Sequence, residues 1–406
     1  MKKNNLASDL YIAKDFYTGN AGKQENLPVE VGELWTSRQR QMHPLHYTVS
    51  YRASFKPELP DFFIRTYLAK KNAGMILDPF GGRGTTVIQG NMLGFSGVHN
   101  DLSPISAFLA SSRRKIPELD TLEQTLKGLK LNLSSKPVKK DAERLSPFFH
   151  KETLSEILNL RKILNDSDDP AVRYIGLTAL SRLHGHSDGF FSVYSFPQIS
   201  IMPVAQMRNN KKRGIRPEYK NIKERIIRKM KRDLSRPLPE EYHVSSEKNY
   251  YTGHDARDLQ SVEDESIALI VTSPPFLDKV NYVLDNWMRA WFLDVEEELK
   301  KIRLSILSNP EDWTDFMKDV MVEMGRILEP GGRAVIEVGE VVYGGKVMNL
   351  EQLLMDQLPL KTKGGILRAE KVFINSQKFT KLANCWDVKN NVKGTNSNRC
   401  LVLRKH

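Results

Sequence analysis

The sequence predicts an α/β fold with a mostly parallel sheet and an inserted, largely helical region. Short β-branched or apolar runs bounded by turn residues occur near both ends of the chain. An amphipathic stretch precedes one of these runs, and strands that alternate with such helices form parallel sheets. Residues 101–266, between the second and third expected strands, are far too many for one crossover connection and carry helical periodicity.

Length and composition limit the class of protein. A chain of 406 residues, with 40% apolar and 27% charged residues, has room for roughly two or three globular domains. No apolar run approaches the roughly 18 residues of a membrane span. The N-terminus, Met-Lys-Lys-Asn-Asn, lacks the pattern of a signal peptide, and only Cys385 and Cys400 are cysteines. We therefore expect a cytoplasmic protein that does not associate with a membrane.

The expected elements define the organisation of the chain. Strands are expected at 75–77, 97–100, 267–272, 333–338, 371–374 and 399–403. A helix is expected after Asn309 as its N-cap, with Pro310 in the first turn and an end at Pro330-Gly331-Gly332. The predicted division is a lead segment (1–40), a first part of the α/β domain (41–111), an inserted helical, basic region (112–247) and a second part of the α/β domain (248–406).

A glycine-rich segment, Asp78-Pro79-Phe80-Gly81-Gly82-Arg83-Gly84-Thr85-Thr86, follows the first expected strand. Glycines at a strand-to-helix turn let the backbone approach a ligand, and the helix N-terminus that follows favours an anionic group. Asp101 ends the next expected strand about 20 residues on, where a carboxylate can bind a ribose hydroxyl. A Walker motif is excluded because no Gly-Lys-Thr or Gly-Lys-Ser follows. The remaining alternative is a tight turn without a ligand.

A second motif, Thr272-Ser273-Pro274-Pro275-Phe276, ends the apolar run 267–271. Two consecutive prolines remove two backbone donors and fix φ, which leaves a stiff loop with free acceptors. The Ser273 hydroxyl and the Pro274 carbonyl can hold the protons of an exocyclic base amine. Phe276 offers a face on which an extruded base can stack. The alternative is that Ser-Pro-Pro only terminates the strand.

With both motifs in place, the chain resembles the DNA amino-methyltransferases, which transfer a methyl group from S-adenosylmethionine to cytosine N4 or adenine N6. The family pattern Asp-Pro-Phe-x-Gly-x-Gly-Thr-Thr is matched at 78–86, and the catalytic loop is matched at 273–276. The resemblance implies a Rossmann-like methyltransferase fold with S-adenosyl-L-methionine as cofactor. In the family, Ser at the head of the loop usually accompanies cytosine N4 methylation.

The resemblance also implies the residues of the site. The segment His46 to Pro60 is similar to the one that covers the methionine end of the cofactor, and Gly253 to Arg257 is similar to the motif whose Asp meets the adenine amine. The large insertion departs from most family classes because it precedes Gly253. The expected cofactor contacts are Ser54, Phe55, Asp78, Phe80, Gly82, Gly84, Thr85, Asp101, Asp255 and Ala256, and the expected catalytic residues are Ser273, Pro274, Pro275 and Phe276.

The positive charge of the chain is concentrated in one stretch. The net charge is +12, and residues 208–236 contain thirteen Lys or Arg against three acidic residues, which predicts binding of a polyanion. An apolar stripe within 219–234 predicts a helix that docks by one face and presents the other to phosphates, with an ordinary solvated face as the alternative. The expected DNA contacts in this stretch are Lys211, Lys212, Arg213, Arg216, Arg228 and Arg232.

Residues 182–194 combine polar donors with aromatic side chains. His184, His186 and Asp188 suggest metal ligands, but no further ligand cluster lies nearby and the expected chemistry needs no metal. We expect no metal site here, and either a DNA-facing loop that includes His186 or a local turn.

The sequence therefore predicts a site-specific methyltransferase that extrudes a cytosine from double-stranded DNA and methylates its N4 amine. Adenine N6 methylation is the nearest alternative. The alternative of another class is a catalytically idle nucleic-acid-binding protein that retains the fold, which the complete motifs at 78–86 and 273–276 disfavour. RNA as the substrate, the oligomeric state and a cognate restriction endonuclease as partner are left open.

Overall fold

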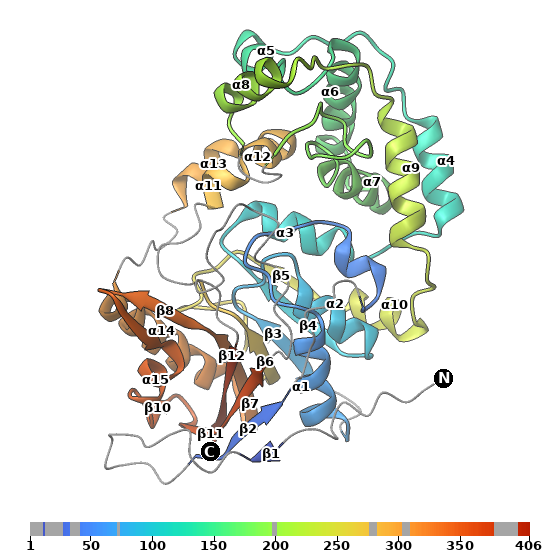
Figure 1. Cartoon of the computed structure of the whole chain (residues 1–406). Coiled ribbons are helices and arrows are strands. Elements are labelled where there is room, and N and C mark those ends of the chain that lie inside the picture. The colour runs from blue at the N-terminus through green and yellow to red at the C-terminus, as the bar shows by residue number, and fades with distance from the viewer. Residues whose placement is uncertain are drawn as a thin grey trace.

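The structure is a computed structural model that describes residues 11–12, 27–32, 41–70, 74–196, 201–275, 282–302, 309–376 and 397–406. It has two parts (Figure 1). A large sheet with helices on its faces forms the α/β part, and a group of helices above it in this view forms the helical layer.

The α/β part is built on one sheet. Within the described residues, its strands lie in the order β1-β2-β11-β12-β7-β6-β3-β4-β5, and β10 pairs with β11. The strands from β7 to β5 are parallel to one another, whereas β12 is antiparallel to β7. The predicted Rossmann-like α/β fold with a mostly parallel sheet is confirmed. The strands are Tyr11–Ile12 (β1), Val29–Gly32 (β2), Met75–Asp78 (β3), Ser96–Asn100 (β4), Tyr250–Thr252 (β5), Ile267–Thr272 (β6), Leu328–Val338 (β7), Leu360–Thr362 (β10), Gly365–Ser376 (β11) and Ser397–Lys405 (β12), with Glu340–Tyr343 (β8) and Lys346–Asn349 (β9) as a separate pair.

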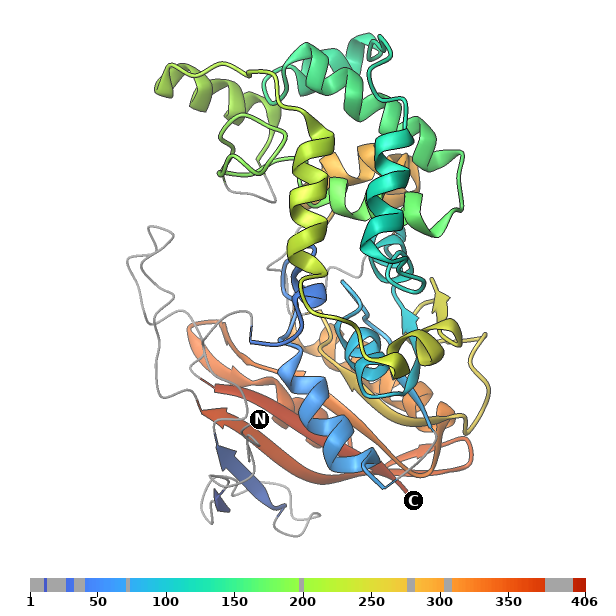
Figure 2. The ribbon, with the colours of Figure 1, turned by 90° about the vertical axis from the view of Figure 1, so that its right-hand side faces the viewer.

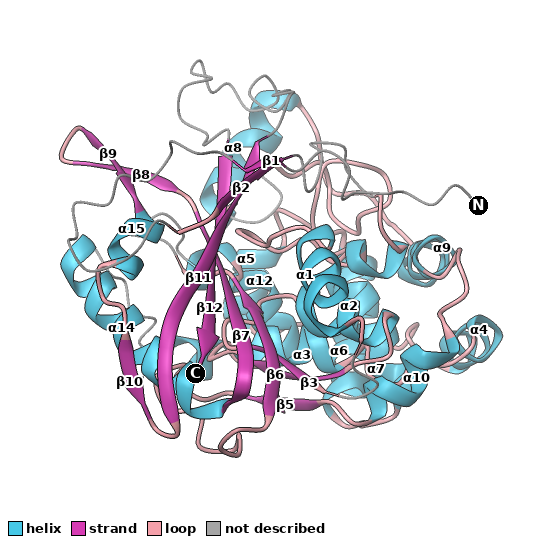
Figure 3. Cartoon of the chain, turned by 90° about the horizontal axis from the view of Figure 1, so that it is seen from below, coloured by secondary structure: helices cyan, strands magenta, loops and turns pink. Residues whose placement is uncertain are grey.

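Helices cover both faces of this sheet (Figure 3). Helix α1 (Glu58–Leu68) packs on one face and α14 (Pro310–Ile327) packs on the other. Successive side chains of a strand point to opposite faces. In β7, accordingly, Val335 joins the core under α1, whereas Ala334 and Ile336 join the core under α14. Helices α2 (Thr85–Met92), α3 (Pro104–Ser111) and α15 (Leu350–Met355) complete this part together with α10 (Glu240–Glu247).

Helix α14 begins as its sequence predicts. The side chain of Asn309 accepts a hydrogen bond from the backbone N–H of Asp312 at 2.8 Å, and Pro310 occupies the first turn. The helix ends at Ile327, before the expected Pro330-Gly331-Gly332, because β7 already begins at Leu328. Among the described residues, neither α14 nor any other helix is long and apolar enough to cross a membrane.

The helical layer has one hydrophobic core, which continues into α2, α3 and α10 of the α/β part. Its helices are Leu119–Gly128 (α4), Lys139–Leu145 (α5), Lys151–Asn165 (α6), Pro170–Leu180 (α7), Pro203–Arg213 (α8), Ile222–Asp233 (α9), Tyr282–Asp285 (α11), Trp287–Leu293 (α12) and Glu296–Lys301 (α13). Ile222, Ile226 and Met230 of α9 are fully buried in this core, where the sequence places an apolar stripe. Leu160 of α6 and Leu177 of α7 belong to the same core.

Two segments pack on a different part of the protein from the one that the predicted division assigns to them. They are α10, within the predicted helical region 112–247, and α11 to α13, within the predicted α/β range 248–406. Helix α10 lies on the α/β part, where the Tyr242 hydroxyl donates to the carbonyl of Arg113 at 2.6 Å. Helices α11 to α13 belong to the helical layer instead, and Nε1 of the fully buried Trp291 donates to Asp141 of α5 at 2.8 Å. Periodicity shows that a helix has an apolar face, but it does not show which core that face meets.

Replacing Trp291 by Ala should lower the free energy of unfolding by about 3–5 kcal/mol, because the change empties the space of a fully buried indole and removes a donor to Asp141. Guanidinium-induced unfolding, followed by circular dichroism, measures the loss. Leu133→Ala is the control, since it truncates an exposed apolar side chain of the same layer. An effect no larger than that of the control would contradict the packing of α12 in the helical core.

Candidate active site

The carboxyl ends of five neighbouring parallel strands share one edge of the sheet. From β3 the chain continues to β4 and β5 on one side, whereas β6 and β7 lie on the other side. Open α/β sheets bind ligands at such a switch point. Asp78 at the end of β3 and Thr272 at the end of β6 flank it.

The carboxylate of Asp78 joins the two loops at the switch point. It is fully buried and accepts hydrogen bonds from the hydroxyl of Thr272 at 2.6 Å, the hydroxyl of Thr86 at 3.1 Å and the backbone N–H of Phe80 at 3.1 Å. Burial raises the pKa of Asp78 to about 7, although these hydrogen bonds act in the opposite direction. Asp78 thus fixes the glycine turn to the end of β6. Its direct contact with a cofactor stays a prediction.

The glycine turn is open on one side. Gly82 (φ 51°) and Gly84 (φ 80°) adopt the left-handed conformation that glycine tolerates best. A Cβ on Gly84 would lie 2.9 Å from the Cβ of Ala110, so this glycine is needed for close packing of α2 and α3. A Cβ on Gly82 would meet nothing nearer than the ring of Tyr51 at 3.7 Å. Thr85, the first residue of α2, is buried next to the turn.

Asp101 holds the turn from the neighbouring strand end. Its Oδ2 accepts from the backbone N–H of Gly82 at 2.8 Å, and its Oδ1 accepts from the N–H of Ser103 at 2.8 Å. Burial raises the pKa of this carboxyl. The carboxylate therefore lies beside Gly82, where the sequence places a ribose-binding acid.

The loop after β5 is held at the same edge. Asn100 donates to the carbonyl of His254 at 2.9 Å and accepts from the N–H of His254 at 2.9 Å. Asp255 follows and pairs with Arg257 at 2.7 Å, and this hydrogen-bonded partner lowers the pKa of Asp255. Ala256 is buried. The loop thus brings the half-exposed Asp255 next to the strand end that carries Asp101.

The upstream segment 50–56 lies against the glycine turn. The guanidinium of Arg83, inside the turn, donates to the carbonyl of Phe55 at 3.3 Å and to the hydroxyl of Thr85 at 3.1 Å. Ser54 and Phe55 are therefore close to the turn, and their contact with a cofactor stays a prediction. Phe80 packs towards α14, with its ring centroid 6.0 Å from that of Phe316.

Ser273 has a buried acidic neighbour that was missed in the sequence. Glu337 is near the end of β7, and its carboxylate is hydrogen-bonded to the hydroxyl of Ser273 and to the side-chain amide of Asn398 on β12. Burial raises the pKa of Glu337. In the sequence, the sign of such a neighbour is that Glu337 directly follows the apolar run 334–336. An acid is unusual in a strand that is otherwise suited to full burial.

The rest of the predicted catalytic loop is only partly described. Pro274 is buried, and the carbonyl of Pro275 accepts a hydrogen bond from Nε1 of Trp313 at 3.0 Å. Phe276 lies outside the described residues. Its stacking role stays a prediction.

Two contacts join the segment 50–56 to the end of α11 and to α12. Arg52 pairs with Asp285 at 2.7 Å, and the buried Arg289 donates to the carbonyl of Ser50 at 2.6 Å. The partners are 233 and 239 residues apart in the chain, so no local pattern could have indicated these contacts. They connect the segment 50–56 to the helical layer.

The predicted DNA contacts fall into two groups, of which the first is exposed. Lys211, Lys212 and Arg213 end α8, and Arg216 follows it. Among the described residues, no carboxylate pairs with any of these four side chains, and Arg213 lies over the ring of Tyr194 at 4.1 Å. The positive charge of this group is therefore available to a partner. His186, in the loop after α7, is also exposed.

The second group, Arg228 and Arg232 of α9, lies among cations that are largely used inside the protein. Lys220 donates to the carbonyl of Ser192 at 2.7 Å, Lys223 donates to that of Leu129 at 2.7 Å, and Lys231 pairs with Glu123 at 3.0 Å. Arg228 and Arg232 remain 66% and 55% exposed, with carboxylate oxygens of Asp188 and Asp233 at 3.7 and 3.9 Å. Much of the charge counted on α9 thus stabilises the helical layer.

The described residues contain no group of three or more His, Cys, Asp or Glu side chains arranged to hold a metal ion. His184 makes a local contact through Nδ1, which lies 3.3 Å from the Ser195 hydroxyl. Asp188 pairs with Arg225 at 3.0 Å.

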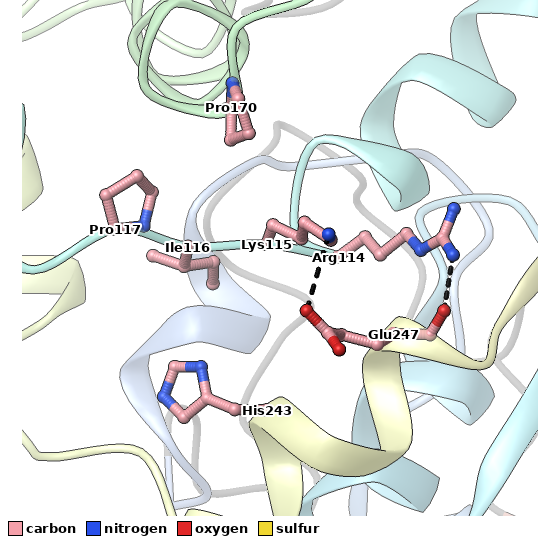
Figure 4. A pocket seen from close by; sticks show the side chains of 7 residues that line it. All are labelled: Arg114, Lys115, Ile116, Pro117, Pro170, His243 and Glu247. Atoms are coloured by element: carbon pink, nitrogen blue, oxygen red, sulfur yellow. Dashed lines mark hydrogen bonds and ion pairs between the residues drawn. The ribbon is translucent and has the colours of Figure 1, made fainter.

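A cavity of about 230 Å³ lies beside the link between α3 and α4 (Figure 4). Lys115 and Glu247 form an ion pair of 3.3 Å in its wall. The other lining residues are Arg114, Ile116, Pro117, Pro170 and His243. None of the predicted site residues lines this cavity.

Fold and geometry together define a Rossmann-like α/β protein with a candidate ligand site at its switch point. No protein-family model matches the chain. The chain is 26% identical over 128 residues to the Type II methyltransferase M.MjaII of Methanocaldococcus jannaschii, a match that covers 30% of this chain and 23% of that relative. It is 23% identical over 338 residues to the Type II methyltransferase M.BsoBI of Geobacillus stearothermophilus, covering 75% and 63% respectively. The chain thus spans less than two thirds of either relative.

Among solved structures, the chain is similar to TTHA0409 from Thermus thermophilus, with 26% identity and a TM-score of 0.22. The match covers 37% of this chain and 50% of that one.

Replacing Glu337 by Gln should make the stability of the protein less dependent on pH. Burial raises the pKa of Glu337, so the folded protein keeps a proton that the unfolded chain releases above its usual pKa of about 4.3. This stabilising contribution is complete below that value and is lost as the pH rises towards the raised pKa. The urea midpoint of the wild type should therefore fall relative to that of Glu337→Gln as the pH rises above about 4.

Glu263→Gln is the matched control for this measurement, because Glu263 is exposed. Its urea midpoints should follow those of the wild type. Parallel curves for the wild type and Glu337→Gln would show that burial does not raise the pKa of the carboxyl beside Ser273.

Proposed function

We propose that the protein is an S-adenosyl-L-methionine-dependent DNA methyltransferase that acts on the N4 amine of cytosine. The observation that carries the proposal is the buried Asp78 carboxylate, which joins the glycine turn after β3 to the Ser273 loop after β6. A cofactor over the turn and a base held by the loop would then meet at the switch point. Similarity to two Type II methyltransferases supports DNA as the substrate.

The residues at the strand ends suit this cofactor. The open face of Gly82 admits a ligand close to the backbone, and the N-terminus of α2 favours the carboxylate of a methionine group. The Asp101 carboxylate, which already accepts from Gly82 and Ser103, lies where it can also accept from a ribose hydroxyl, and Asp255 can accept from an adenine amine. S-adenosyl-L-methionine supplies a methyl group on a sulfonium sulfur, which is already a good leaving group.

Ser273 and Pro274 would hold the amine of an extruded base. The Ser273 hydroxyl donates to the Glu337 carboxylate, so its lone pairs can accept an amine N–H. The Pro274 carbonyl offers a second acceptor. Holding both protons draws the nitrogen lone pair out of conjugation with the ring, and positioning then lowers the barrier without a covalent enzyme intermediate.

Methylation leaves the amine nitrogen with a proton that must depart. Where Glu337 is deprotonated, Ser273 can accept this proton as it passes its own proton to Glu337, so that the number of protons is conserved. A carboxyl whose pKa is raised by burial is a better acceptor than an ordinary surface carboxylate. Glu337 is therefore the final acceptor within the protein, before solvent.

The basic surface would bind the duplex from which the base is extruded. The exposed Lys211, Lys212, Arg213 and Arg216 neutralise phosphates, with Arg228 and Arg232 as further contacts. His186 lies in a neighbouring exposed loop.

The function is tested by mass spectrometry of nucleosides from the DNA of cells that express the protein. Wild-type protein should produce N4-methylcytosine, and Ser273→Ala should lower its formation on the order of 100-fold, because one preorganised hydrogen-bonding group is lost. N6-methyladenine instead would replace cytosine as the target and leave the rest of the proposal intact. Cofactor binding without any methylated nucleoside would favour an idle nucleic-acid-binding protein.

Gly82→Val should weaken binding of S-adenosyl-L-methionine, since the side chain would project into the open space between the turn and Tyr51. Isothermal calorimetry measures the affinity. Gly331→Val is the control, because Gly331 has a similar left-handed φ of 78° but no heavy atom within 4 Å of an added Cβ. Equal affinities of the two variants would place the cofactor away from the glycine turn.

A further inference from the structure

Helix α8 has an inverted distribution of side chains. Surface helices normally bury apolar side chains and expose polar ones. In α8 the fully buried side chain is Gln206, whereas Val204 and Met207 are 59% and 57% exposed. No side chain of α8 belongs to the hydrophobic cores formed by the described residues. The fold therefore does not account for the outward face of this helix.

Polar contacts hold α8 in place. Nε2 of Gln206 donates to the carbonyl of Tyr194 at 2.9 Å, and Nδ2 of Asn210 donates to that of Pro147 at 2.7 Å. One turn further, the guanidinium of Arg213 lies over the Tyr194 ring at 4.1 Å. These three side chains follow one another at helical spacing, so α8 is anchored along one face. The opposite face is presented in a defined orientation.

The outward face of α8 combines one small apolar side chain with several basic ones. At about 100° per residue, Val204, Arg208 and Lys211 lie opposite the anchored Gln206 and Asn210, with Lys212 beside them. All four are exposed, and α8 contains no acidic residue. Within the described part of the chain, Arg208 forms no ion pair with a carboxylate. This charge is complementary to a polyanion.

The dimensions of α8 fit a groove of duplex DNA. Its eleven residues span about 16 Å, and the major groove, about 12 Å wide, admits an α-helix. Figure 2 shows α8 as the light-green helix that projects from the helical layer at the upper left. A projecting helix that is anchored on one side can enter a groove without rearrangement of its own core.

Resting on the proposed function, we propose that α8 enters the major groove of the target DNA, where Arg208 and Val204 read base edges and Lys211 and Lys212 contact phosphates. Arg208 is central on the outward face, and its guanidinium can donate two hydrogen bonds to O6 and N7 of a guanine. Val204 lies one turn earlier and suits the methyl group of a thymine. Lys223 and Lys231 of α9, by contrast, are used within the helical layer that carries α8.

Selection of bound duplexes from a randomised library tests this assignment without relying on methyl transfer. The wild type should select a motif that contains a guanine, and Arg208→Ala should lose the preference at that position only. Arg208→Lys keeps the charge but lacks the two parallel N–H donors of the guanidinium, so it should lose the same preference. Arg228→Ala is the matched control, since it removes an exposed arginine of α9 and should leave the motif unchanged.

A second measurement identifies the atoms involved. Replacing the selected guanine by 7-deazaguanine removes N7 and should weaken wild-type binding roughly 10-fold or more, with no further loss in Arg208→Ala. Lys212→Ala should weaken all duplexes alike and flatten the slope of log affinity against log salt by about one unit. An unchanged motif in Arg208→Ala, or a loss of affinity that is equal on all duplexes, would overturn the proposal.

The two proposals fail separately. A wild-type protein that selects a motif but leaves no methylated base would refute the methyltransferase function. The comparison of the wild type and Arg208→Ala on duplexes with guanine and with 7-deazaguanine would still support α8 as the helix that reads the bases. Methylated DNA together with an Arg208-independent motif would refute the role of α8 alone.

Discussion

The buried carboxylate of Asp78 is the contact on which the candidate site depends. A carboxyl without exposure to water is costly unless donors satisfy it, and here the donors come from the glycine turn, from α2 and from the end of β6. A displacement of β6 relative to β3 would break at least one of these bonds. The two loops at the switch point therefore have a fixed position relative to each other, and neither can move without the other.

The parts of the structure that follow from local pattern could be predicted. The strands at 267–272 and 333–338, the capped helix after Asn309 and the apolar stripe of α9 depend on periods and end signals within a short segment. The neighbour of Ser273 depends on strand order and register instead. Glu337 reaches Ser273 only because β7 lies beside β6, and a sequence does not show that pairing.

Charge shows the same division between local and long-range information. The sequence counts thirteen cations in 208–236, but Lys220 and Lys223 end on backbone carbonyls of other segments while Lys211 and Lys212 stay exposed. The local composition of these segments is similar. What distinguishes them is whether another part of the chain offers an acceptor, and this is decided by tertiary packing.

The path of the chain between the two parts restricts how such a protein can diversify. The helical layer takes its core mainly from 119–234 and again from 282–302, while α10 between them packs against α2 and β4 of the α/β part. A chimaera that exchanged only 112–247 with a homologue would leave Trp291 facing a foreign core and α2 facing a foreign α10. Exchange of the whole helical layer would replace two separate segments, 119–234 and 282–302, and would therefore require four compatible junctions at once. Point substitutions on exposed positions, which disturb no core, are the easier evolutionary route to a new specificity.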